Sequence, residues 1–156
     1  MLGSAHNQKE IKDKLLQKVY SNEKQALLAL NNALMDSVKV HQRSDVPCGI
    51  FLSGGIDSSA IISAMSELNQ TPVTSFTSGF ATGPQDEREH AQLIANKLGT
   101  EHIEISFDEN DFISLLPTVA AALDDPVADY AALPTFKLGQ KAAHEGIKVI
   151  LSGEGG

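Results

Sequence analysis

The sequence contains no tryptophan, a single cysteine and no long apolar segment. Cys48 cannot form an internal disulfide or a cysteine-based metal site. It lies in the apolar stretch 46–52, so we expect a buried, unreactive thiol. No run of about 18 apolar residues and no basic-then-apolar N-terminal segment is present. The sequence therefore predicts a soluble, cytoplasmic protein that does not act at a membrane.

Positive charge is also scarce. Twelve Lys and Arg residues face 20 Asp and Glu residues, which gives a formal charge of −8. This leaves no basic surplus to neutralise a nucleic-acid backbone, so nucleic acid is not expected as a partner. The histidines do not have the spacing of a metal site, and we expect surface or packing roles for them. They are His6, His41, His90, His102 and His144.

What the sequence does contain suits one domain with a packed core: 156 residues, 42% apolar and 21% charged. An apolar helical spacing over residues 10–40, broken near 21–23, predicts an N-terminal helical segment within 1–42. Residues 43–156 then alternate between strands and helices. The predicted strands are 47–52, 73–77, 101–105 and 148–151; the predicted helices are 57–68, 86–98, 110–123 and 133–145.

Strands that alternate with helices need crossover connections, which favours a parallel sheet. The predicted fold class is therefore α/β, a three-layer open parallel sheet with helices on both faces. In such sheets the ligand site lies beyond the carboxyl ends of the strands. Two predicted strands run into glycine-rich segments there, Ser53–Gly55 and Ser152–Gly156, so both segments point to one site.

The most specific of these segments is Ser-Gly-Gly-Ile-Asp-Ser-Ser at 53–59. Gly54 and Gly55 allow close approach to a phosphate, and the N–H groups of a following helix add favourable partial charge. Hydroxyl groups can donate to the phosphate, and the Asp57 carboxylate can hold Mg²⁺ against its oxygens. The hydroxyls belong to Ser53, Ser58 and Ser59.

A plain strand-to-helix turn, with Asp57 or Ser58 as its N-cap, is the alternative interpretation of this segment. Two other phosphate motifs are excluded by inspection. There is no Gly-x-x-x-x-Gly-Lys-Ser/Thr and no Gly-x-Gly-x-x-Gly after a strand. A P-loop kinase or a dinucleotide dehydrogenase is therefore not expected.

The Ser-Gly-Gly-x-Asp-Ser segment resembles the pyrophosphate-binding loop of N-type ATP pyrophosphatases. Further segments, in the same order, resemble the synthetase domain of glutamine-dependent asparagine synthetases, and the resemblance spans residues 43–156. These segments are 43–47, 74–80, 86–89, 98–102, 124–126 with 132–135, and 149–156. The resemblance implies that residues 43–156 form part of the ATP-pyrophosphatase domain, whose fold is adenine nucleotide alpha hydrolase-like, a Rossmann-like class.

The resemblance implies an ATP-dependent amide ligase. A carboxylate, aspartate in the namesake enzymes, would be adenylated with release of pyrophosphate, and ammonia would then displace AMP to give asparagine. The implied cofactors are ATP and Mg²⁺. By the same resemblance, Asp57 binds the metal and takes part in catalysis, and Glu154 handles a proton at the adenylate step. The nucleotide would contact Leu52, Ser78, Ser152 and Gly153, and the pyrophosphate would contact Ser53, Gly54, Gly55, Asp57 and Ser58.

The sequence also departs from the family pattern. Family members continue past the second glycine of the 152–156 segment with Asp-Glu, whose Asp is the partner carboxylate for Mg²⁺, whereas this sequence ends at Gly156. We therefore expect little or no ligase activity from this polypeptide alone. The family's glutaminase nucleophile is a cysteine directly after the initiator Met, where this sequence has Leu2, so ammonia would come from a glutaminase domain absent here.

Two alternatives stay open at this point. One is a catalytically incomplete ATP- or AMP-binding module with a regulatory or partner-docking role. The other is a different ligase with the same loop, such as an NAD, GMP or argininosuccinate synthetase. Self-association into a homo-oligomer is one way to cover sheet surface exposed beyond the last predicted strand.

Overall fold

The computed structural model describes residues 22–80, 87–125, 129 and 131–153. The chain divides into two units, Met1–Asp36 and Ser37–Gly156. Helix α2 (Glu23–His41) crosses this division. It begins where the side-chain oxygen of Asn22 accepts a hydrogen bond from the Gln25 N–H at 3.0 Å, which satisfies one N–H of its first turn. None of the described helices combines the length and the apolar character that a membrane span requires.

The second unit contains a four-stranded sheet in which every pairing is parallel, as predicted. Its strands are β1 (Cys48–Phe51), β2 (Thr74–Phe80), β3 (Glu101–Phe107) and β4 (Val149–Leu151). Their order is β3-β2-β1-β4, so the chain steps outward from β1 to β3 and then returns to the other side of β1. Strands β2 and β3 run longer than predicted because their ladder continues to the pair Phe80 and Phe107.

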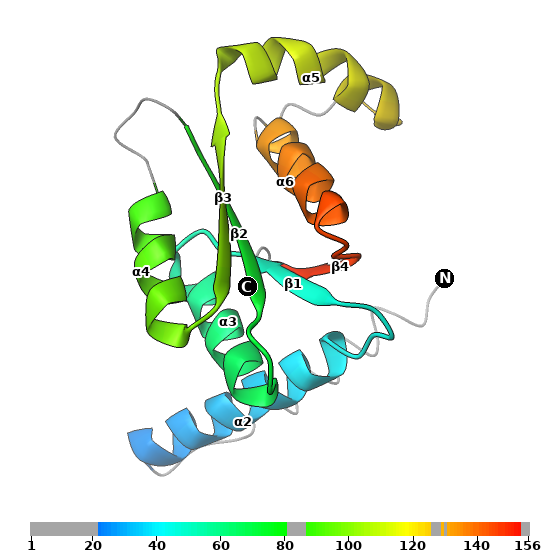
Figure 1. Ribbon diagram of the computed structural model, residues 1–156. Helices are drawn as coiled ribbons and strands as arrows, with labels where there is room; N and C mark the ends of the chain where they lie inside the picture. The colour runs from blue at the N-terminus through cyan, green and yellow to red at the C-terminus, as the bar shows by residue number, and fades with distance from the viewer. Residues whose placement is uncertain (1–21, 81–86, 126–128, 130, 154–156) are drawn as a thin grey trace. The chain divides into compact units, whose positions relative to one another are not determined.

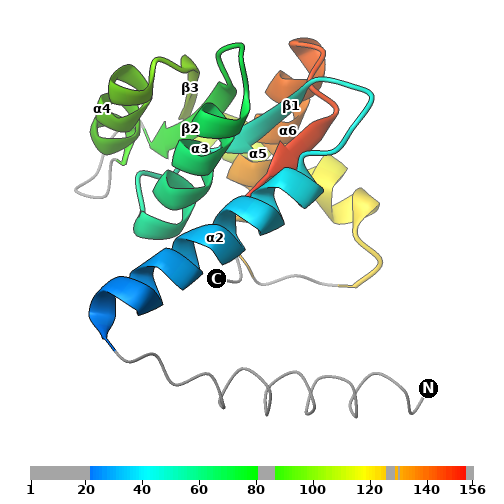
Figure 2. The same ribbon diagram turned by 90° about the horizontal axis from the view of Figure 1, so that it is seen from below.

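Helices cover both faces of this sheet, which confirms the predicted three-layer architecture (Figures 1 and 2). Helix α3 (Ile56–Leu68) contacts β1, and α4 (Arg88–Leu98) contacts β2 and β3. On the opposite face, α6 (Ala132–His144) packs on β2, and α5 (Glu109–Ala122) packs on α6. Each of these four helices begins and ends within two residues of its predicted range.

The face covered by α6 holds an apolar core. Phe76 at its centre is fully buried, and partly buried Phe51 and Ile150 pack against it from β1 and β4. The other buried members are Ile105, Leu138, Ala142 and Ile147. This packing fixes α6 over the middle of the sheet and so fixes the residues that α6 presents at the strand ends.

Lys137 fastens α6 to the far end of β3 and to the start of α5. Its ammonium group donates to the Ser106 carbonyl at 2.8 Å and pairs with the Asp111 carboxylate at 2.6 Å. Asp111 also forms a capping box with Asp108 at the start of α5. The hydrogen bond from Lys137 holds the pKa of the Asp111 carboxyl below its ordinary value. The hydrogen bond and the ion pair of Lys137 therefore hold α6 in place in addition to its apolar packing.

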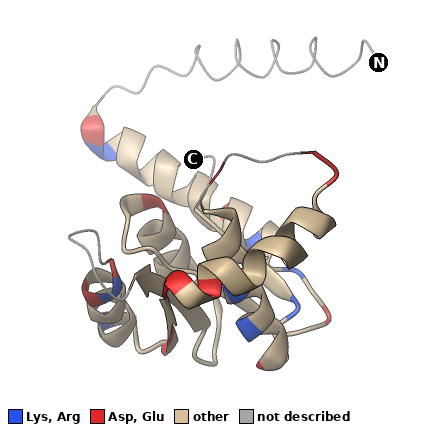
Figure 3. Ribbon diagram, turned by 90° about the horizontal axis from the view of Figure 1, so that it is seen from above, with Lys and Arg blue, Asp and Glu red and all other residues tan. Residues whose placement is uncertain are grey.

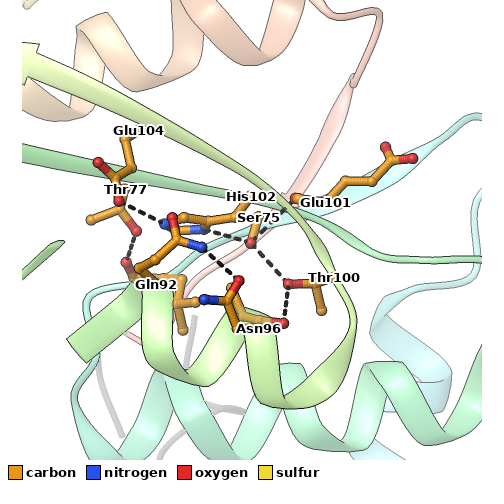
Figure 4. A network of polar contacts seen from close by, with 10 residues as sticks. Ser75, Thr77, Gln92, Asn96, Thr100, Glu101, His102 and Glu104 are labelled. Atoms are coloured by element: carbon orange, nitrogen blue, oxygen red, sulfur yellow. Dashed lines mark hydrogen bonds and ion pairs between the residues drawn. The ribbon is translucent and has the colours of Figure 1, made fainter. Parts of the chain in front are cut away.

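The opposite face is polar where α4 crosses β2 and β3 (Figure 4). Ser75 is fully buried, and its hydroxyl lies 2.9 Å from Nδ1 of His102 and 3.4 Å from the hydroxyl of Thr100. The His102 side chain is 3% exposed, and its Nε2 has no hydrogen-bond partner among the described residues. The Glu104 carboxylate lies 3.8 Å from that nitrogen. Burial lowers the pKa of His102, and the charge of Glu104 opposes part of that effect.

This arrangement predicts that the protein loses stability in mild acid. The unfolded chain takes up a proton on His102 below its ordinary pKa of 6.5, whereas the folded chain resists it until lower pH. The free energy of unfolding should therefore be largest above pH 6.5 and fall as the pH drops below that value. Urea unfolding at pH 7.5 and pH 5.5 measures the difference.

His102→Asn should flatten this pH dependence, since it removes the titrating group. His144→Asn serves as the control because His144 is an exposed histidine at the end of α6. An equally steep pH dependence in the His102 variant and in the control would show that other groups cause the acid sensitivity.

Candidate functional site

The return of the chain from β3 to β4 creates a switch point between β1 and β4. Strand β1 pairs with β4 through Ile50 and Leu151, the last β1–β4 pair, so the two strands end side by side. The residues that follow them, Ser53–Gly55 and Ser152–Gly153, therefore meet beyond the carboxyl ends of these strands, as predicted. In open α/β sheets this crevice is where ligands bind.

The loop after β1 has the geometry of an anion cradle. Gly54 has φ +80°, a conformation that glycine adopts without strain. Gly55 is the N-cap of α3, and no side chain caps the helix, which contradicts the interpretation of Asp57 or Ser58 as a structural N-cap. The Ser53 hydroxyl accepts from the Gly55 N–H at 3.2 Å and lies 3.0 Å from the Ser58 hydroxyl. The Ser53 and Ser58 hydroxyls and the first-turn N–H groups of α3 thus all lie within one short segment.

The first turn of α4 packs closely against the backbone of Gly54. A β-carbon at this position would lie 2.9 Å from the His90 β-carbon and 3.2 Å from the Ala91 nitrogen. The space behind the loop is therefore filled by α4. Gly54 consequently does not line the cavity in front of the loop.

The segment after β4 closes the other side of the site. A β-carbon at Gly153 would lie 2.7 Å from the Ser58 nitrogen and 3.2 Å from the Asp57 carbonyl carbon. Only a glycine permits this close approach between the end of β4 and the first turn of α3. The two segments that sequence reasoning assigned to one site are therefore in direct contact.

A cavity of about 230 Å³ opens between these segments. Its lining includes eight of the residues expected at the site: Leu52, Ser53, Gly55, Asp57, Ser58, Ser78, Ser152 and Gly153. Ser59 lies outside it, because its hydroxyl donates to the Gly55 carbonyl within the helix. Glu154 lies outside the described residues. The predicted site thus gathers around one cavity, with Gly54 and Ser59 in supporting positions.

Five other lining residues were not predicted: Phe51, Phe76, Thr77, Thr135 and Leu138. Glu87 also lines the cavity, and it was expected there in one of two interpretations of the charged segment 86–89. Phe76, Thr77 and Leu138 belong to the interior of a strand or helix, and only the packing of α6 against β2 brings them to the cavity. Thr135 could have been found, since it belongs to one of the segments that carry the family resemblance. Glu87 lies at the start of α4, in a stretch of charged residues whose sequence suits both a solvated helix start and a site-facing role.

The electrostatics of the lining are acidic. Among the described lining residues, Asp57 and Glu87 contribute carboxylates, and none is Lys or Arg. In the view of Figure 3 the basic residues are dispersed over several elements rather than gathered on one. Within the described ranges, no group of three or more His, Cys, Asp and Glu side chains could hold a metal ion. A metal here would depend on one or two carboxylates and on oxygens of its ligand.

Cys48 lies at the start of β1, at the opposite edge of the sheet from the cavity. It is half-buried, and burial raises the pKa of its thiol. A raised pKa reduces the thiolate fraction at neutral pH, so the thiol is poorly nucleophilic. This agrees with the expected unreactive role, although the side chain is less buried than the sequence predicted.

The contact at Gly153 predicts that even one methyl group is harmful there. Gly153→Ala places its β-carbon against backbone atoms of α3, which cannot move without shifting the helix. We expect a loss of about 1–3 kcal/mol in the free energy of unfolding, measured by thermal or urea unfolding.

Gly139→Ala is the matched control, because Gly139 lies inside α6 with nothing within 4 Å of its β-carbon position. Alanine is the better helix former, so this variant should be as stable as the parent or more stable. Equal stability of the two variants would argue against the tight β4–α3 contact.

Comparison with known proteins agrees with this geometry. The sequence profile described as asparagine synthase matches residues 29–156. Asparagine synthetase [glutamine-hydrolyzing] 1 of Bacillus subtilis is 40% identical over 137 residues, which cover 88% of this chain and 21% of the relative. Asparagine synthetase B [glutamine-hydrolyzing] of Escherichia coli is 38% identical over 142 residues, which cover 81% of this chain and 25% of the relative. The chain thus spans about a quarter or less of the length of these relatives.

A solved structure has a similar fold. NMN synthetase from Francisella tularensis aligns with a TM-score of 0.53 and 22% identity, over 83% of this chain and 54% of that one. At that identity the likeness concerns the fold alone, and it supports the predicted adenine nucleotide alpha hydrolase-like class. The asparagine synthase profile covers most of the chain, including both glycine-rich strand ends, so this chain belongs to the asparagine synthase family.

Proposed function

We propose that this chain contributes the ATP-binding part of an amide-forming ligase that adenylates the carboxylate of aspartate. The observation that carries the proposal is the meeting of two glycine-rich strand ends around one cavity, with hydroxyls, uncapped helix N–H groups and the Asp57 carboxylate on its walls. Membership of the asparagine synthase family and two relatives that are glutamine-hydrolysing asparagine synthetases support the choice of reaction.

In this proposal the loop 53–58 holds the β- and γ-phosphates of ATP. The hydroxyls of Ser53 and Ser58 and the first-turn N–H groups of α3 supply donors to phosphate oxygens. Ser78, Ser152 and Gly153 line the remainder of the cavity, where the nucleoside would bind. Phe51 and Leu138 add apolar surface suited to a base or ribose.

The charge of the cavity requires a cation. A triphosphate is strongly anionic, and the part of the lining that the structure describes has two carboxylates and no Lys or Arg. Without a counter-charge, ligand and site would repel each other. The donor set fits Mg²⁺, which takes oxygen ligands and usually needs only one or two carboxylates besides substrate phosphates and waters. Asp57 would hold this ion, which would neutralise charge on the leaving pyrophosphate.

The proposed chemistry has two steps. A carboxylate oxygen of aspartate attacks the α-phosphorus of ATP, and the bond from that phosphorus to the pyrophosphate oxygen breaks. Ammonia then attacks the acyl carbon, loses a proton, and AMP leaves with its oxygen to give asparagine. The residues of this chain would contribute mainly by orientation and by hydrogen bonds to the departing oxygens. Glu154 is proposed to accept or deliver a proton at the adenylate step.

The remaining partners follow from the same reaction. Ammonia would come from a glutaminase domain, and the place of action would be the cytoplasm, where the ATP and the amino acid are available. Self-association as a homo-oligomer is a further part of the proposal. This chain alone is expected to bind Mg-ATP and to show little or no ligase turnover.

The experiment that tests the site is a comparison of two neutralised carboxylates on α3. Asp57→Asn removes the charge at the cavity, and Glu67→Gln removes one from an exposed position near the other end of the same helix. Titration calorimetry with ATP, with and without excess Mg²⁺, should show at least about tenfold weaker Mg-ATP binding for Asp57→Asn, because the metal loses its protein ligand. Glu67→Gln should bind as the parent chain does.

Equal Mg-ATP affinity in both variants would rule out Asp57 as the metal ligand. The chain joined to the rest of its synthetase domain, given Mg-ATP, aspartate and ammonia, distinguishes the ligase from a nucleotide sensor. Release of pyrophosphate that depends on aspartate supports the ligase, whereas tight Mg-ATP binding without pyrophosphate release from the chain joined to the rest of its synthetase domain supports a regulatory binding module.

A further inference from the structure

Thr77 on β2 makes a contact that the glycine-rich motif does not call for. Its hydroxyl donates a hydrogen bond to the carbonyl oxygen of Leu52, the last residue before the loop. Both residues are buried, with Thr77 2% and Leu52 1% exposed. The N–H of Leu52 is also tied to β2, since it donates to the Phe76 carbonyl at 2.8 Å. Both backbone polar groups of Leu52 are therefore held by the neighbouring strand.

This contact lies where β1 leaves the sheet. The β1–β2 ladder ends at the pair Phe51 and Phe76, so Leu52 lies one residue past it. A buried carbonyl at such a position needs a partner, because it can no longer reach water. The side chain of Thr77 provides one in place of a further ladder bond. The orientation of the peptide bond from Leu52 to Ser53 is thereby set from β2.

The orientation of this peptide bond also sets where the Ser53 side chain lies in the loop. The next hydroxyl along the chain, that of Ser53, accepts from the Gly55 N–H at 3.2 Å and lies 3.0 Å from the Ser58 hydroxyl. A rotated Leu52–Ser53 peptide would carry the Ser53 hydroxyl away from both. The donors at the start of α3 would then lose their common direction, although none of them touches Thr77.

We propose that Thr77, although it belongs to the cavity lining, is a positioning residue for the phosphate-binding loop, because its hydroxyl is engaged by the Leu52 carbonyl. For its ligand this inference rests on the proposed function, namely Mg-ATP binding at the loop. Its mechanical part, that Thr77 holds residues 53–59 in one conformation, stands independently of the ligand. No sequence pattern predicts this role, because threonine is a common strand residue whose side chain usually serves packing.

A second buried hydroxyl on the same strand provides a matched control. Ser75 is two residues earlier on β2, is fully buried, and contacts His102 in the polar layer beneath α4 instead of the loop (Figure 4). Thr77→Val and Ser75→Ala each delete one buried hydroxyl from β2. Any difference between them in the loop therefore reflects the Leu52 contact and not a general loss of stability.

The test uses the full chain and two measurements. Amide hydrogen exchange of residues 53–59 without ligand should be at least about tenfold faster in Thr77→Val, and Mg-ATP affinity by calorimetry should be about tenfold weaker. Thr77→Ser keeps the hydroxyl and should restore both. Ser75→Ala should leave both unchanged, even where its melting temperature falls. Thr77→Ala removes the same hydroxyl with less crowding and replaces the valine variant if that variant does not fold.

The outcomes separate the inference from the proposed function. Loop exchange in Thr77→Val that matches Ser75→Ala overturns the positioning role. Faster loop exchange with unchanged Mg-ATP affinity confirms that Thr77 holds residues 53–59, and it overturns the role of that contact in nucleotide binding. A parent chain that binds no Mg-ATP counts against the proposed function, and the exchange measurement still decides whether Thr77 holds the loop.

Discussion

The pairing of β1 with β4 is the constraint on which the rest of the second unit depends. Strand β1 lies inside the sheet, between β2 and β4, so its carboxyl end is flanked by neighbours from distant parts of the sequence. That arrangement brings Gly153 onto the first turn of α3 and leaves a cavity between the two glycine-rich ends. The connection from β3 to β4 also crosses the face of the sheet opposite α3 and α4, where α5 and α6 form the third layer.

The two faces of the sheet differ in polarity. Against α6 the contacts are apolar and centred on Phe76, which gives a rigid support for one wall of the cavity. Against α4 the sheet presents Ser75, Thr77 and His102, whose polar atoms must find partners in a dry environment. Phe76 and Thr77 are adjacent, so a single strand supplies apolar support on one side and directional hydrogen bonds on the other.

Much of this could be predicted from sequence, for identifiable reasons. The alternation of apolar runs with helical spacing predicted the helices and the parallel sheet, because period and crossover length are local properties. The Ser-Gly-Gly-x-Asp-Ser segment predicted the loop, because glycine conformation and helix polarity act within a few residues. Leu52, Ser53, Asp57 and Ser58 accordingly gather where they were expected.

The rest depended on contacts that sequence spacing does not encode. The position of β4 beside β1, the role of α4 behind Gly54 and the carbonyl contact of Thr77 all join residues that are far apart in the chain. The boundaries of β2 and β3 were missed because Ser78 and Gly79 are turn-forming types that here continue a ladder. The domain boundary expected near residue 42 and the role of Glu154 stay predictions.

The strand order also has a consequence for how the protein is made. Because β4 is the last of the described strands in sequence, its contact with β1 closes a longer loop than the other described strand pairings, and such non-local pairings form slowly. During synthesis the earlier strands can associate while β4 is still in the ribosome. The wall formed by Ser152 and Gly153 is missing until β4 emerges, so a nucleotide bound as proposed could stabilise the nascent chain only after β4 has paired with β1.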